Sequence, residues 1–367
     1  MARIVYALSG EGRGHTSRAL AIAEALELEG HEVLYCAGGV AYEILTELNK
    51  PVLRVPALEH VVYNNTLRPW RTLWHNLPHL LRSGRLIRDL ARSLEAFQAE
   101  WLINDFEYFS GRAAALLGLP VVGFNRQQIL TEARYPIPWR WRLNAALVGA
   151  VVRWIAPPQA VLTLIPTFLP LPLRRPERVR LVPPVIRSAV LRAEPAEGEH
   201  VLVYINRSRG AEKLLRLLER FAEVPFHVYG FSEAIAVARN VKMRPSSLEG
   251  FLRDLASARA VIATAGFTLI SEALYLGKPL LALPNRGIFE QTLNAWQLAQ
   301  AGFGAAVVGR DPTLEDISGF LARWAAYKSA IQRRFEAGNP EVLRVLTALW
   351  GPERPEPVLS GLRGSVY

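Results

Sequence analysis

Cysteine is almost absent from this chain of 367 residues, in which Cys36 is the single example. One cysteine excludes an internal disulfide and any zinc or iron–sulfur site that is built from several thiolates. Such usage is typical of a reducing compartment. We therefore expect a cytoplasmic protein, which the basic segments described below would bring to the inner face of the cell membrane.

Long apolar runs are absent as well. The longest one, residues 143–152, includes Asn144 and has about half the length that a bilayer crossing requires. The N-terminus enters a strand-like run, residues 3–8, without the basic and apolar segments of a signal peptide. These absences predict a protein with neither a transmembrane helix nor a signal peptide.

Acidic residues are scarce in residues 134–192, which contain ten arginines and one acid, Glu177. The whole chain has a formal net charge of +10. An uneven positive charge of this size indicates an anionic partner. Nucleic acid, phospholipid head groups and a phosphate-bearing substrate would each explain it.

What the chain has in abundance is apolar sequence, 50% of all residues, in short runs that alternate with helical patterns. A length of 367 residues exceeds what one core usually organises and favours two domains. The first strand-like run is residues 3–8 in the N-terminal half and residues 201–205 in the C-terminal half. This alternation predicts an α/β protein with two Rossmann-like domains, each built on a parallel sheet with right-handed crossovers.

Proline gathers between the two halves. Residues 157–184 contain eight prolines, a density that neither a helix nor a central strand tolerates. We place the interdomain connection there, which gives an N-terminal domain of residues 1–182 and a C-terminal domain of residues 183–340. Residues 341–367 are predicted to form a last helix and a tail that return to the N-terminal domain.

A glycine-rich turn with Gly10, Gly12 and Gly14 follows the first strand and leads into a helical pattern. In parallel sheets, ligands bind beyond the carboxyl ends of the strands, where such a turn meets the positive N-terminus of a helix. A turn without a ligand would have the same composition, so the glycines alone do not decide. The second strand ends in residues 35–39 without the acid that a dinucleotide requires, which disfavours NAD binding.

A histidine, His15, stands at the tip of this turn, where an imidazole can act as a general base near neutral pH. Asp105 directly follows the strand-like run 101–104, so we expect it beyond the same edge of the same sheet. It would orient His15 and stabilise its protonated form, as the third member of a catalytic triad does. Glu107 is the alternative partner, and a histidine that only positions backbone is the alternative to a base.

The first strand of the C-terminal half is followed by a loop of small residues and two arginines, Arg207 and Arg209. Such a loop suits a diphosphate, although an ordinary surface turn would have the same composition. The residues predicted to contact the diphosphate are Ser208, Arg209 and Gly210.

The longest signal lies in residues 263–304, where a strand, a glycine turn, a helix, a Gly-Lys-Pro break, another strand and another helix follow one another. Glu272 lies in the first turns of the first helix, where its carboxylate could accept two ribose hydroxyls. Polar side chains on one face of the second helix suit a polyol, unless that face is only solvated. The residues predicted to bind a ligand with ribose and polyol groups are Gly266, Phe267, Thr268, Glu272, Glu290, Gln291 and Asn294.

This C-terminal pattern resembles the donor-sugar signature of the GT-B glycosyltransferases, in the superfamily that contains family 28 and the UDP-glycosyltransferases. The pattern consists of Gly266, Ser271-Glu272-Ala273, Gly277-Lys278-Pro279, Pro284, Glu290-Gln291 and Asn294-Ala295. Residues 208–211 are similar to the diphosphate loop of the lipid-linked N-acetylglucosaminyltransferase of peptidoglycan synthesis, and Gly14-His15 is similar to a pair in the first loop of both groups. Residues 9–18, 104–107 and 263–294 look most like glycosyltransferase-like proteins of bacteria and archaea.

The resemblance implies a GT-B fold whose two parallel sheets face each other across a cleft, with the acceptor bound by the N-terminal domain. It implies that Glu272 binds the ribose of a UDP-sugar and that Glu290, Gln291 and Asn294 face the sugar and the phosphates. It also implies that His15 deprotonates the acceptor hydroxyl with the assistance of Asp105.

The chain departs from the family pattern at Glu290, where glutamine or aspartate is usual, so the identity of the sugar is not defined. Thr264 stands eight residues before Glu272, where retaining enzymes of this fold place a second glutamate, and this favours an inverting reaction. No Asp-x-Asp motif stands in a suitable loop. We therefore expect no metal or other cofactor, with helix amides and Arg207 or Arg209 stabilising the diphosphate.

Tryptophan and arginine are interleaved in residues 67–92 and 134–154. Such mixtures beside apolar helical stretches suit an interfacial segment, and they predict a lipid or membrane-associated acceptor. Tryptophans packed inside, with solvated arginines, are the alternative. The tryptophans expected to contact an anionic membrane surface are Trp70, Trp74, Trp139 and Trp141.

Two other functions are compatible with this inventory. A UDP-N-acetylglucosamine 2-epimerase would use a similar nucleotide pocket but needs carboxylates at C2 of the sugar. A non-catalytic protein that binds a nucleotide sugar or nucleic acid is permitted by the charge. The chain lacks a basic strand with paired aromatics and a helix-turn-helix signal, so we expect no nucleic-acid partner. The sequence defines neither the acceptor nor the oligomeric state.

Overall fold

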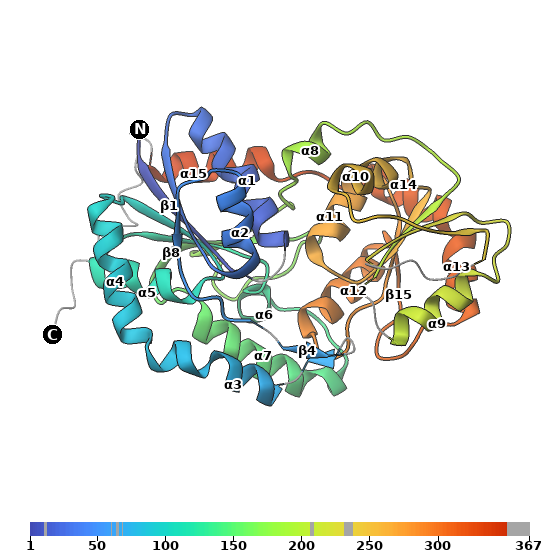
Figure 1. The fold of residues 1–367 in the computed structure, drawn as a ribbon, viewed down its shortest axis with the longest axis horizontal. Helices are drawn as coiled ribbons and strands as arrows, with labels where there is room; N and C mark the ends of the chain where they lie inside the picture. Colours follow the sequence, from blue (N-terminus) through green and yellow to red (C-terminus); the bar gives the residue numbers. More distant parts are fainter. Residues whose placement is uncertain are drawn as a thin grey trace. The chain divides into compact units, whose positions relative to one another are not determined.

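The computed structural model describes residues 1–10, 13–59, 61–63, 66–67, 69–205, 209–230 and 238–350. Internal contacts divide the chain into two compact units. The first unit contains residues 1–59, 74–185 and those from 337 onward, and the second contains residues 60–73 and 186–336. Each unit is built on its own parallel sheet, as the alternating sequence pattern predicts (Figure 1).

The first unit contains a seven-stranded sheet in the order β3-β2-β1-β6-β7-β8-β9, with every neighbouring pair parallel. Parallel neighbours require crossovers on the faces of the sheet, which explains why a helix follows most of the strands. In chain order the strands are β1 (Arg3–Leu8), β2 (Glu32–Ala37), β3 (Val52–Arg54), β6 (Trp101–Asp105), β7 (Val121–Phe124), β8 (Ala160–Pro166) and β9 (Val179–Val182).

The helices of the first unit cover both faces of this sheet, because successive residues of β1 point to opposite sides. Ile4, Tyr6 and Leu8 lie in one buried cluster, whereas Val5 and Ala7 lie in another. The helices are α1 (Arg13–Leu28), α2 (Gly39–Glu47), α4 (Ser83–Ala96), α5 (Tyr108–Leu117), α6 (Ile129–Glu132), the 3₁₀ turn Trp139–Trp141, α7 (Arg142–Ile155) and α15 (Asn339–Trp350). A further helix, α3 (Pro69–Leu81), contains residues of both units.

The last helix, α15, belongs to the core of the first unit although it lies at the other end of the chain. Val342 and Leu346 are buried in the cluster that also contains Ile4. The ring of Trp350 meets that of Trp101 edge to face, with centroids 5.6 Å apart. Burial of this apolar face stabilises the helix more than its intrinsic propensity does.

The proline-rich segment 157–184 is not the strand-free connection that its composition suggests. It contains β8 and β9, the last two strands of the first sheet. The prolines are tolerated because Pro158 precedes β8, Pro166 ends it, and Pro183 follows β9. At these positions a missing N–H removes no ladder bond from the middle of a strand, and β9 is an edge strand.

The second unit contains a six-stranded parallel sheet in the order β12-β11-β10-β13-β14-β15. Its strands are β10 (Val201–Tyr204), β11 (Phe226–Tyr229), β12 (Val241–Met243), β13 (Ala260–Ala263), β14 (Leu280–Ala282) and β15 (Gly304–Ala306). The helices are α8 (Ser188–Leu191), α9 (Arg209–Leu218), α10 (Leu248–Ser257), α11 (Phe267–Tyr275), α12 (Phe289–Ala301), α13 (Leu314–Ala322) and α14 (Trp324–Arg334). A short antiparallel pair, β4 (Val62–Tyr63) and β5 (Thr66–Leu67), completes it.

Candidate active site

His15 and Asp105 lie in contact at the carboxyl edge of the first sheet. Asp105 is the last residue of β6, and its neighbour β1 leads through the glycine turn into α1, which carries His15. The Nδ1 atom of His15 is 2.9 Å from Oδ1 of Asp105. Asp105 is fully buried, whereas 13% of the His15 side chain is exposed, so the imidazole can be reached from solvent while its partner cannot.

A third residue, Arg18, completes this contact. Its guanidinium holds both oxygens of Asp105, with Nη2 2.7 Å from each of them and Nε 3.0 Å from Oδ2. Burial alone would raise the pKa of Asp105, but the charges and hydrogen bonds of Arg18 and His15 hold it below its usual range. Sequence reasoning did not identify Arg18. The available signal was its spacing, because residues three apart lie on the same face of a helix.

The geometry determines which nitrogen of His15 carries the proton. An ionised carboxylate only accepts hydrogen bonds, so the contact with Asp105 requires a proton on Nδ1. The lone pair of the neutral ring is then on Nε2, the atom that a general base uses. Nε2 lies 3.4 Å from the amide nitrogen of Gln127, which follows β7, and the Oε1 atom of Gln127 is buried without a hydrogen-bond partner.

Glu107 does not contact His15 in the structure but caps the following helix. Its carboxylate accepts hydrogen bonds from the backbone N–H groups of Phe109 and Ser110 at the start of α5. Phe106 separates the two acids and has a φ of +61°, a left-handed conformation that is costly for an aromatic residue. Of the two acids, Asp105 is therefore the partner of His15.

Two of the three glycines predicted for the first turn, Gly10 and Gly14, lie within the described residues. A Cβ atom on Gly10 would come within 2.6 Å of the carbonyl oxygen of Gly38, so only glycine allows these two loops to approach. Gly14 lies in the first turn of α1. Gly12 lies outside the described residues.

The glycine turn of the second unit leads into the N-terminus of α11, as expected. Gly266 is the N-cap residue, and a Cβ atom placed on it would meet nothing within 4 Å. Phe267 and Thr268 form the first turn of the helix, whose leading N–H groups have no partner within the helix. Open space beside the positive N-terminus of a helix is suited to an anionic group.

Glu272 lies on α11, is 4% exposed, and pairs with Arg187. The Nε atom of Arg187 lies 2.7 Å from Oε1 of Glu272, and Nη2 donates to Oε2 at 3.0 Å. Burial raises the pKa of Glu272, and the charge of Arg187 only partly opposes this. The carboxylate is thus pre-oriented but costly to keep ionised.

The three polar residues of α12 differ in what they contact. Gln291 accepts a hydrogen bond from the backbone N–H of Asn285 at 2.9 Å. Asn294 is 1% exposed and donates to the carbonyl oxygen of Ala265, beside the glycine turn, at 3.2 Å. Glu290 is partly exposed in the first turn of the helix. The two amides therefore brace neighbouring loops, Asn294 from a buried position and Gln291 from a partly exposed one, whereas Glu290 begins the helix and is also partly exposed.

The second glycine loop is only partly described. Ser208 lies outside the described residues. Arg209 and Gly210 begin α9, the helix that follows β10 at its carboxyl end, but their side chains are outside the description.

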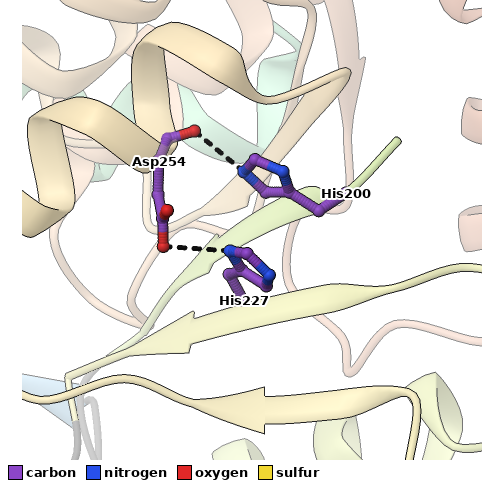
Figure 2. Close-up of side chains that lie close together, drawn as sticks. All are labelled: His200, His227 and Asp254. Carbon is purple, nitrogen blue, oxygen red and sulfur yellow. Dashed lines mark hydrogen bonds and ion pairs between the residues drawn. The ribbon is translucent and has the colours of Figure 1, made fainter. Parts of the chain in front are cut away.

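Three potential metal ligands also lie together in the second unit: His200, His227 and Asp254 (Figure 2). Asp254 accepts from His227 at 2.9 Å and from Arg244 at 3.0 Å, so a guanidinium already balances its charge. The two imidazole centroids lie 4.1 Å apart and the ring planes are 16° from parallel, so the in-plane lone pairs of the two rings lie in nearly parallel planes and do not converge on one point. This cluster is better suited to holding α10 on the sheet than to binding a cation.

Comparison with known proteins extends these observations. The profile of the family described as Glycosyl transferase family 1 matches residues 2–325. An "Uncharacterized glycosyltransferase" of Methanosarcina acetivorans is 26% identical over 94% of this chain and 97% of its own length. The UDP-N-acetylglucosamine–N-acetylmuramyl-(pentapeptide) pyrophosphoryl-undecaprenol N-acetylglucosamine transferase of Thermus thermophilus is 28% identical over 82% of this chain and 86% of its own. MurG of Acinetobacter baumannii, at 16% identity, superimposes with a TM-score of 0.64 over 95% of this chain and 99% of its own.

Proposed function

Because the chain belongs to glycosyl transferase family 1 and has a GT-B fold, we propose that it transfers a sugar from a UDP-sugar to an acceptor hydroxyl with inversion at the anomeric carbon. Glycosyltransferase activity follows from the family. The donor, the stereochemistry and the acceptor are the proposed part. The observation that carries the proposal is the contact between His15 and the buried Asp105, which directs the lone pair of the neutral ring to Nε2.

In the proposed reaction, Nε2 of His15 removes the proton of the acceptor hydroxyl as its oxygen attacks the anomeric carbon. The bond between that carbon and the diphosphate oxygen breaks, and UDP leaves with the electron pair. Asp105 faces the imidazolium that forms and stabilises it, as in other base–carboxylate pairs. A single displacement of this kind inverts the anomeric configuration and needs no second carboxylate.

The donor is proposed to bind the second unit. Glu272 would accept hydrogen bonds from the two ribose hydroxyls, and the amides that begin α11 would face the diphosphate. These amides together with Arg207 or Arg209 would balance the charge of the leaving group, so we propose that no metal is required. The Thermus thermophilus relative, whose name includes UDP-N-acetylglucosamine, supports a uridine nucleotide.

The acceptor is proposed to be a lipid or to lie at a membrane surface. Trp70, Trp74 and Trp139 are 77%, 68% and 82% exposed, which is rare for a side chain of this size in water. On α7, Leu143 and Leu147 stand exposed one helical turn apart, and the helix carries arginines at both ends. No helix among the described residues is both long and apolar enough to span a bilayer. Contact with a membrane would therefore be interfacial.

The proposal is tested by incubating the protein with a panel of nucleotide sugars and a lipid extract, followed by mass spectrometry of the products. We expect UDP release and a glycosylated lipid that form together, with the anomeric configuration of the donor inverted by NMR. A UDP-sugar that changes to its epimer without acceptor would instead identify the 2-epimerase alternative. Transfer with retention would contradict the single displacement.

A further inference from the structure

Arg18 is a buried charge that the reaction described above does not use. It lies on α1 three residues after His15, and 7% of its side chain is exposed. Its Nη2 atom lies 3.2 Å from Nδ1 of His15 as well as 2.7 Å from both oxygens of Asp105. The carboxylate that faces the base is therefore shared with a second cation.

The contact between Arg18 and His15 is electrostatic rather than a hydrogen bond when the ring has its proton on Nδ1. A nitrogen that carries a proton in the ring plane cannot accept from the guanidinium. After His15 takes a second proton, the imidazolium faces one negative charge, Asp105, and one positive charge, Arg18. The positive charge opposes the stabilisation that Asp105 provides.

Few other charges are described around this group. From β1, Tyr6 faces Asp105 and Arg18, and its buried phenol stays neutral because burial raises its pKa. From the segment after β7, Gln127 contributes an uncharged amide. The aromatic ring of Phe124 on β7 lies beneath the guanidinium, 5.7 Å from its carbon. Among the contacts described for His15, those with Asp105 and Arg18 involve charged side chains.

We propose that Arg18 is a positioning residue that holds Asp105 against Nδ1 of His15 and, by sharing that carboxylate, offsets part of the stabilisation that Asp105 gives to the protonated ring. The inference rests on the proposed role of His15 as the acceptor base. The bidentate fork fixes the orientation of the carboxylate, which a lysine would not do.

The test is an NMR titration of the His15 ring nitrogens in the protein without any substrate, in wild type and in Arg18→Gln. We expect the midpoint of the His15 titration to rise by about one pH unit in Arg18→Gln, because the uncompensated Asp105 then favours the imidazolium. In Arg18→Gln/Asp105→Asn the midpoint should fall again. Arg112→Gln, which removes a half-buried arginine elsewhere in the same unit, should leave it unchanged. An unchanged midpoint in a folded Arg18→Gln protein overturns the proposal.

Arg18→Lys keeps the charge and removes the fork, so its titration midpoint should stay near that of wild type while turnover falls. If Arg18→Gln does not fold, a midpoint that rises by a full unit in Arg18→Lys contradicts the charge argument. In Arg18→Gln the rise of turnover with pH should also occur at higher pH. Turnover should recover once the pH exceeds the shifted midpoint. A purely structural role would lower turnover equally at every pH. Because the titration needs no sugar donor or acceptor, it can fail or succeed independently of the proposed reaction.

Discussion

Arg187 and Glu272 form a two-point ion pair inside the second unit, with contacts of 2.7 and 3.0 Å between the guanidinium and the carboxylate. The carboxylate that is proposed to bind ribose is thus held in one orientation before any ligand arrives. Pre-orientation of this kind reduces the entropy that a ligand must overcome on binding.

Replacement of Glu272 by alanine should weaken UDP binding. Two hydroxyl contacts to a carboxylate are charge-assisted, so we expect a loss of about 1.5–3 kcal/mol in a folded protein, measured by calorimetry. Glu249→Ala, an exposed substitution on α10, is the matched control and should bind UDP as wild type does. Equal UDP affinity in Glu272→Ala and wild type would remove the assignment.

The affinity for UDP should also depend on pH through Glu272. Burial raises the pKa of this carboxyl, so it becomes neutral at a higher pH than an exposed glutamate. A neutral carboxyl is a weaker acceptor for ribose hydroxyls, and binding should therefore weaken as pH falls through the raised pKa. Calorimetry over a pH series checks this. Glu272→Gln should bind more weakly but lack this pH dependence, and a persisting dependence would assign it to another group.

His15→Ala should lower turnover by roughly 10²- to 10⁴-fold, which is the usual contribution of a general base. UDP affinity should be nearly unchanged, because the donor is proposed to bind the other unit. Asp105→Asn should have a smaller effect, since it leaves the imidazole in place without its carboxylate. Steady-state kinetics measures turnover, and calorimetry measures UDP affinity. A His15→Ala protein that loses both together would show that His15 only positions backbone.

Glu107→Ala should destabilise the first unit without removing the base. Loss of a helix N-cap costs about 0.5–2 kcal/mol, which chemical denaturation can measure. Turnover per folded molecule should remain close to that of wild type. A loss as large as that of His15→Ala, in a protein of unchanged stability, would restore Glu107 as a catalytic candidate.

Binding to anionic liposomes should decrease steeply with salt and should require Trp70, Trp74 and Trp139, which are exposed. Trp141 is partly buried in the 3₁₀ turn, so Trp141→Ala should have a smaller effect. Neutral liposomes serve as the control in a sedimentation assay. If the protein stays in solution with anionic vesicles at low salt, the arginines serve another partner.

The sequence by itself determined the class of fold and the edge of each sheet at which the candidate site residues lie. Apolar runs that alternate with helical patterns require parallel strands, and parallel strands align their carboxyl ends at one edge. His15 and Asp105 could therefore be paired from the sequence, because Asp105 ends one strand and His15 follows the neighbouring strand of the same sheet. The same reasoning placed Gly266 at a helix N-terminus.

Only the tertiary structure decided which side chains meet across those edges. The left-handed backbone at Phe106 separates Asp105 from Glu107, and no sequence pattern specifies that φ angle. The sharing of Asp105 with Arg18 depends on how α1 lies against β6, a distance set by packing. Residues 157–184 contain β8 and β9 although their proline content predicts a connection without strands, because proline is excluded from hydrogen-bonded positions within strands rather than from their ends. Periodicity follows from local geometry, whereas contacts between elements follow from how the whole core packs.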